Sequence, residues 1–117
     1  SILSNLFSPS SHSFREIVTA HYYENITLEE LAILNNQSLS TFKREFKKTY
    51  NSSPATYLRE KKLEKSEQLL ISTDLRTTDI AYECGFSNVS HFSKTFKNKH
   101  GISPTIYKLT HLDKSLN

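Results

Sequence analysis

One feature constrains the fold of this chain more than any other: a segment of about 50 residues occurs twice. A shift of 50 residues superimposes identical residues of the two copies, namely Phe42 on Phe92, Phe46 on Phe96, Lys47 on Lys97, Ser53-Pro54 on Ser103-Pro104 and Tyr57 on Tyr107. Earlier in the copies the shift is 49, so that Leu31-Ala32 falls on Ile80-Ala81 and Asn36 on Gly85. The chain is therefore expected to contain two copies of one folding unit, the second with one extra residue.

The apolar spacing from Phe14 onward is helical, and no long alternating run indicates a strand. Thr27 and Glu30 have the spacing of a capping box at a helix start. Ser53-Pro54 and Ser103-Pro104 each place a serine cap before a proline, which is tolerated at the first helical position. We predict an all-α fold with seven helices, over residues 13–23, 28–35, 39–49, 54–71, 77–84, 89–99 and 104–109.

Each copy has the pattern of a helix-turn-helix. The turn between its two helices needs a residue that tolerates positive φ, which Gly85 and Asn36 supply. The second helix follows a polar cap, Ser38 or Asn88, and its phenylalanines, four residues apart, face inward. A plain helical bundle would bury the same phenylalanines, so only the opposite face distinguishes the two interpretations.

The repeat also predicts how the chain is organised. We expect a first helix-turn-helix subdomain and a second one, joined by a long linker helix. The serine-rich start reads as the remnant of a linker to a missing upstream domain. The predicted ranges are 1–13 for this remnant, 14–53 for the first subdomain, 54–71 for the linker helix, 72–109 for the second subdomain and 110–117 for a tail.

Charge is distributed unevenly along the chain, although the formal net charge is only +3. Residues 38–65 carry +5 and residues 87–108 carry +4 with no acid, whereas 24–37 and 66–86 carry −3 each. Two basic second helices at matching repeat positions favour a polyanionic partner over a merely solvated surface. A linker helix of about 18 residues is about 27 Å long. With part of a helix diameter added, the recognition helices approach the ~34 Å repeat of B-DNA, so one chain could contact two successive major grooves.

Composition argues against catalytic and membrane functions. One cysteine cannot form an internal disulfide or a cysteine-rich zinc site, which favours a cytoplasmic protein. The five histidines lack metal-ligand spacing, and Cys84, next to the turn glycine, is expected to be a buried structural thiol. No apolar run approaches the roughly 18 residues of a membrane-spanning helix. We expect no enzyme activity, metal or cofactor, and the lack of methionine predicts a fragment of a longer protein.

The chain resembles the DNA-binding domain of the AraC/XylS transcriptional regulators over about residues 14–108. The strongest segment, residues 80–107, reads IAYECGFSNVSHFSKTFKNKHGISPTIY, with I-A, G-F, S-x-F, F-K and G-x-x-P-x-x-Y in the family's places. The first copy, LEELAILNNQSLSTFKREFKKTYNSSPATYL, matches more loosely, since Asn36 and Asn51 stand where glycine is usual and Gln37 where an apolar residue is usual. In the linker helix, Lys61, Lys62 and Ser66 also depart from the pattern.

This resemblance implies a homeodomain-like fold of the AraC type and a bacterial transcription factor, most often an activator. Its partners would be double-stranded promoter or operator DNA and RNA polymerase, and an upstream effector or dimerisation domain would be absent from this chain. The alternative is a protein-interaction module of the same fold that has lost DNA binding. The acid-free segment 87–108 argues against that alternative.

In the first copy, side chains on the early turns of the recognition helix, 39–49, are expected to meet base edges, and those on its flanks phosphates. Ser40, Lys43 and Arg44 are the expected base contacts, and Arg44 suits a bidentate contact to guanine. Thr41 and Lys47 suit phosphates or a thymine methyl group. The predicted set in this copy is Ser38, Ser40, Thr41, Lys43, Arg44 and Lys47.

In the second copy the recognition helix is 89–99. Val89, which suits a thymine methyl group, and Ser90 are its early positions. Ser93 and Lys94 follow one turn later, and Lys97 is expected to contact the DNA backbone. The predicted set in this copy is Asn88, Val89, Ser90, Ser93, Lys94 and Lys97.

Overall fold

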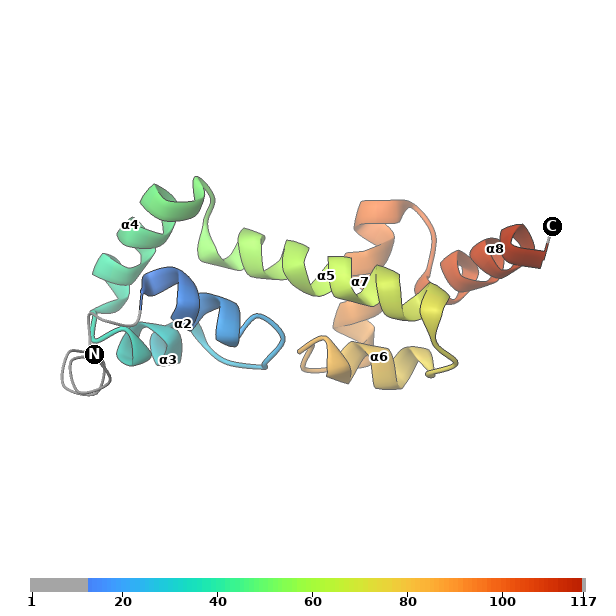
Figure 1. Ribbon diagram of the computed structural model, residues 1–117, viewed down its shortest axis with the longest axis horizontal. Helices are drawn as coiled ribbons and strands as arrows, with labels where there is room; N and C mark the ends of the chain where they lie inside the picture. Colours follow the sequence, from blue (N-terminus) through green and yellow to red (C-terminus); the bar gives the residue numbers. More distant parts are fainter. Residues whose placement is uncertain (1–12, 117) are drawn as a thin grey trace, which may run out of the picture. The chain divides into compact units, whose positions relative to one another are not determined.

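The computed structural model describes residues 13–116, and within them the chain forms helices and connecting turns without a strand (Figure 1). The helices of this range are α2 (Phe14–Ala20), α3 (Leu28–Leu34), α4 (Leu39–Tyr50), α5 (Pro54–Ser72), α6 (Thr77–Glu83), α7 (Val89–His100) and α8 (Pro104–Leu116). The predicted all-α fold is confirmed. The linker remnant predicted over residues 1–13 lies almost wholly outside the described residues.

Two predicted helix ends are wrong, whereas the bounds of the five helices from α3 to α7 agree with prediction to within one residue. α2 ends at Ala20 rather than near residue 23, because the backbone leaves the helical region at His21, where φ is −117°. α8 continues to Leu116 rather than ending near residue 109. No glycine or proline follows Pro104 to interrupt it.

Polar side chains begin the helices as their sequence predicts. Thr27 and Glu30 form the reciprocal capping box, with both hydrogen bonds at 3.1 Å. At the starts of α4, α5, α7 and α8 the cap accepts one hydrogen bond from a backbone amide of the first turn, which has no partner inside the helix, whereas Arg76 before α6 makes no such bond. These bonds run from Thr41 N to Ser38 Oγ (3.2 Å), Thr56 N to Ser53 Oγ (3.3 Å), His91 N to Asn88 Oδ1 (2.7 Å) and Ile106 N to Ser103 Oγ (3.2 Å).

The turns of both copies use the left-handed backbone region. Asn36 has φ of 56° and Gly85 has φ of 92° at the turn inside each helix-turn-helix, as predicted. Asn51 (φ 55°) and Gly101 (φ 78°) do the same at the end of each second helix. Asparagine and glycine are the residues that adopt this conformation at least cost, so the repeat preserves backbone geometry although the residues differ.

The chain divides into two compact units, and one boundary between them falls within α5. Unit 1 contains Ile26–Arg59 and the described residues up to Tyr22, and unit 2 contains Tyr23–Asn25 and the residues from Glu60 onward. The core of unit 1 joins α2, α3, α4 and the first half of α5. Its buried residues are Val18, Leu31, Ala32, Phe42, Phe46 and Leu58.

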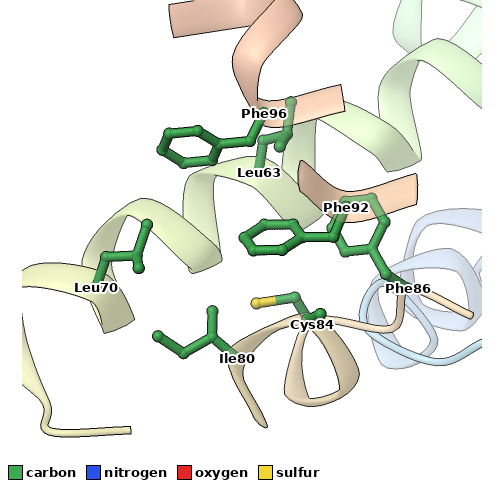
Figure 2. Packing of buried hydrophobic residues seen from close by; sticks show 8 residues of the cluster. Leu63, Leu70, Ile80, Cys84, Phe86, Phe92 and Phe96 are labelled. Carbon is green, nitrogen blue, oxygen red and sulfur yellow. The ribbon is translucent and has the colours of Figure 1, made fainter. Parts of the chain in front are cut away.

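The core of unit 2 is formed by α5, α6, α7 and the turn after α6 (Figure 2). Its buried residues are Leu63, Leu70, Ile80, Ala81, Cys84, Phe86, Phe92 and Phe96. Figure 2 shows the Cys84 side chain among these apolar groups. Its burial raises the pKa of the Cys84 thiol to about 11, which keeps it protonated at neutral pH. The prediction of a buried structural thiol is confirmed.

Candidate nucleic-acid interface

α4 separates apolar and basic side chains onto opposite faces. Phe42 and Phe46 are fully buried in the core of unit 1. Lys43, Arg44 and Lys47 are exposed. Because residues three and four apart share a helix face, the spacing that buries the phenylalanines leaves these cations together on the opposite side. The face is therefore available to a polyanion.

The start of α4 presents hydroxyl groups beside Arg44. Ser38 and Ser40 are exposed, and Thr41 is half-buried. The Ser38 hydroxyl donates to Thr41 Oγ1 at 3.0 Å, and Arg44 Nη2 donates to the same oxygen at 3.3 Å. Arg44 is thus held against the first turn by one of its five donors, and the others can meet a base edge or a phosphate.

α7 repeats this arrangement in unit 2. Phe92 and Phe96 are fully buried, and Ser90, Lys94 and Lys97 are exposed. The segment 87–108 contains no acid, so neither lysine has a carboxylate neighbour in the sequence of its own helix. A second cationic face of the same design is therefore present.

Three further side chains lie at the start of α7. Asn88 is exposed and serves as the helix cap, whereas Val89 and Ser93 are half-buried. Val89 packs against the core of unit 2, which leaves only part of its side chain for a thymine methyl group. His91, which was not among the residues predicted from the sequence, is also exposed and corresponds in the repeat to Thr41. The repeat alignment is the signal that could have identified it.

Several cations outside these two faces are engaged internally. Lys62 Nζ donates to the Gly85 carbonyl at 3.1 Å and Lys65 Nζ to the Glu83 carbonyl at 3.4 Å. Both ammonium groups thereby meet the carboxyl end of α6, where the helix dipole favours positive charge. Burial lowers the pKa of Lys62. These two lysines contribute to the +5 of residues 38–65 but are used to hold unit 2 together.

Lys99 is also neutralised, by two acids of α5. Its Nζ lies 3.0 Å from Glu67 Oε1 and 3.5 Å from Glu60 Oε2. Burial by itself would lower the pKa of Lys99, but the hydrogen bonds and charges of Glu67 and Glu60 raise it above its usual value. His100 Nε2 lies 2.7 Å from the same Glu67 oxygen. The end of α7 is therefore an ion-pair cluster rather than a free cationic surface.

The described range offers little to other kinds of site. No group of three histidine, cysteine, aspartate or glutamate side chains in residues 13–112 is placed to bind a metal ion. Over the same stretch, no helix combines the length and apolar character needed to cross a membrane.

Comparison with known proteins identifies the family to which this fold belongs. A family model described as a helix-turn-helix domain matches residues 31–109. A crystal structure of a transcriptional regulator from Chromobacterium violaceum, described as containing an AraC-type DNA-binding domain, superimposes with a TM-score of 0.69 and 27% identity, covering 87% of this chain and 94% of that one. The chain belongs to the AraC-type helix-turn-helix family.

Two other relatives of this AraC-type domain bear on its function. The DNA-binding domain of AdpA, a global transcriptional factor crystallised with a target DNA, superimposes with a TM-score of 0.81 and 25% identity, covering 86% of this chain and 94% of that one. The transcriptional activator RhaS of Enterobacter sp. (strain 638) is 38% identical over 84 residues, which are 72% of this chain and 30% of RhaS. The chain is an AraC-type DNA-binding domain of the kind found in transcriptional regulators, and it spans about three-tenths of the length of RhaS.

Proposed function

We propose that this AraC-type domain binds double-stranded DNA sequence-specifically, with α4 and α7 in successive major grooves and α5 as the linker between them. The observation that carries the proposal is the repeated design of the two helices. Each buries two phenylalanines and turns exposed cations, Lys43 and Arg44 in α4 and Lys94 and Lys97 in α7, to the opposite side. An α-helix fits the major groove, where the base edges can be distinguished.

The predicted roles of single residues remain part of this proposal. Arg44, which Thr41 holds against the helix, suits a bidentate contact to guanine, and Lys43 and Ser40 lie beside it on exposed positions. In α7, Ser90 and Lys94 occupy the corresponding exposed surface. Lys97, one turn farther along, is assigned to the DNA backbone.

We further propose that the whole protein is a cytoplasmic activator of transcription that contacts RNA polymerase and has an upstream effector or dimerisation domain. The support is that RhaS is named a transcriptional activator and that the matched region is only 30% of it. The domain itself is proposed to have no catalytic activity and to need no cofactor.

The experiment that tests DNA binding is selection of bound duplexes from a random pool, followed by titration of the selected duplex by fluorescence anisotropy. Binding should weaken steeply with salt, with a slope of about 0.9 in log affinity against log salt per phosphate contacted. If no duplex is retained at low salt, the proposal is wrong and the protein-interaction module becomes the better interpretation.

Variants separate base contacts from backbone contacts. Arg44→Ala should cost about 1–3 kcal/mol on the selected duplex and relax base preference at one position, because a bidentate contact is lost. Lys97→Ala should weaken all duplexes to a similar extent, because phosphates carry no sequence information. Equal losses on selected and random duplexes for both variants would contradict these assignments.

A further inference from the structure

Unit 1 carries an open groove of about 620 Å³ on its surface, beside the basic face of α4. One lining residue comes from α2 and the others from α4. They are Arg15, Thr41, Arg44, Glu45, Lys48 and Thr49. Three of these side chains are cationic and one is acidic, so the groove has a net positive charge.

Arg15 is fixed at the carboxyl end of α4. Its Nη2 donates to the Thr49 carbonyl at 3.1 Å, and its Cζ lies 5.0 Å from the centre of the Tyr50 ring. The carbonyl and the aromatic face both favour a cation, and together they orient the guanidinium. One of five donors is used, so the remaining donors are available to an anion.

The other charges of the groove leave it open to an anion. Lys48 is exposed and makes no hydrogen bond or ion pair within the described part of the chain, and it follows Arg44 by one helical turn. Glu45, the acid of the lining, accepts a hydrogen bond from the Gln37 side-chain amide. Glu45 is thus paired with an amide, and within the described residues it forms no ion pair with Arg15 or Lys48.

We propose that this groove binds a phosphate of the DNA backbone, with Arg15 and Lys48 as its ligands. The inference rests on the proposed function, because Thr41 and Arg44 belong both to the groove and to the set of residues predicted to contact DNA. That shared position favours a backbone phosphate of the bound duplex over a free phosphate. At the corresponding end of α7, Asn98 stands at the repeat position of Lys48, and the neighbouring Lys99 pairs with Glu60 and Glu67.

The test compares Arg15→Gln and Lys48→Gln with wild type in anisotropy titrations on one duplex of about three helical turns, ~30 base pairs. Each variant should lower the slope of log affinity against log salt by about 0.9. The ratio of variant to wild-type affinity should then rise about 3.5-fold between about 50 mM and about 200 mM salt. Lys99→Gln is the matched control: it removes one positive charge from an ion pair and should leave the slope unchanged.

The outcomes separate a failure of the phosphate site from a failure of the proposed function. If wild type binds DNA and both variants keep its slope, or if Lys99→Gln lowers it equally, the phosphate site is wrong although the proposed function stands. If wild type does not bind, the proposed function itself fails. Should Arg15→Gln unfold, as circular dichroism would show, Arg15→Lys and Lys48→Gln still test the site, and only Lys48→Gln should lower the slope. Saturable binding of inorganic phosphate alone at micromolar concentration, abolished by Lys48→Gln, would replace the backbone phosphate with a free one.

Discussion

The two helix-turn-helix turns carry different residues at the same repeat position, Gln37 in unit 1 and Phe86 in unit 2. Phe86 is 4% exposed and belongs to the core of its unit. Gln37 is half-buried, its amide nitrogen donates to Glu45 of α4, and its Oε1 is buried without a partner among the described residues. The same backbone turn therefore serves an apolar contact in one unit and a polar one in the other.

This difference affects the recognition helices as well as the cores. In unit 1 the glutamine holds the one acid of α4, Glu45, whereas α7 has no acid at all. The polar turn residue of unit 1 thus occurs together with an acid on α4. The apolar turn residue of unit 2 occurs together with an α7 that has no acid. The repeat thus preserves the backbone geometry of the turn, while the side chains around each turn differ.

The largest effect is expected when the polarity of each turn residue is reversed. Phe86→Gln should lower the free energy of unfolding by about 3–4 kcal/mol, because it loses buried aromatic surface and buries an amide. Gln37→Leu should change it by less than about 1 kcal/mol, because the removal of an acceptor that has no partner offsets the loss of the hydrogen bond to Glu45. Urea unfolding followed by circular dichroism measures both. Tyr82→Gln, at a ring that is 56% exposed, is the control and should change little. A loss for Phe86→Gln no greater than for this control would contradict the difference between the turns.

The second test concerns the two glycines. Gly85→Ala should cost about 2–3 kcal/mol, because its φ is +92° and an added Cβ would lie 2.5 Å from the Tyr23 carbonyl oxygen. Gly101→Ala should cost only about 1 kcal/mol, because its φ is +78° but no atom lies within 4 Å of the added Cβ. The same unfolding measurement gives the difference between them. Equal costs would show that the close approach at Gly85 relaxes freely.

The smallest test exchanges the residues that end the recognition helices. Asn51→Gly should stabilise the protein by about 0.5 kcal/mol, since glycine adopts positive φ with less strain. Gly101→Asn should destabilise it by a similar amount, and the double exchange should be nearly neutral. Thermal unfolding of the three variants checks this. A change of the same sign in both single variants would mean that the side chains, not the backbone, decide the preference.

Much of the fold follows from local sequence signals. Thr27 with Glu30 and the two Ser-Pro pairs fixed helix starts, because a cap acts on amides within its own first turn. The end of α2 was predicted too late. Tyr22 and Tyr23 continue a helical apolar pattern, yet Tyr22 packs on the core of unit 1 while Tyr23 belongs to unit 2. A pattern of apolar residues cannot indicate which core each of them joins.

The exposure of the candidate site residues could be predicted to a similar degree. The repeat located both basic faces, and Lys43, Arg44, Lys94 and Lys97 are all exposed on them. Val89 was harder to assess, because its burial depends on the packing of unit 2. Arg15 was not singled out at all, since it lies 34 residues from the carbonyl of Thr49 that orients it.

Sequence patterns were enough to predict the repeat, the helix caps, the left-handed turns and the helix faces that carry phenylalanine or positive charge. These are properties of residues separated by a few positions, and helical geometry converts such spacing directly into a surface. Which cations remain available to a ligand depends on long-range contacts of the folded chain. Lys62 and Lys65 donate hydrogen bonds to carbonyls 23 and 18 residues away, and Lys99 forms ion pairs with acids of α5. A count of charges along the chain cannot reveal those partners, because ion pairs and helix-end contacts form between segments that only folding brings together.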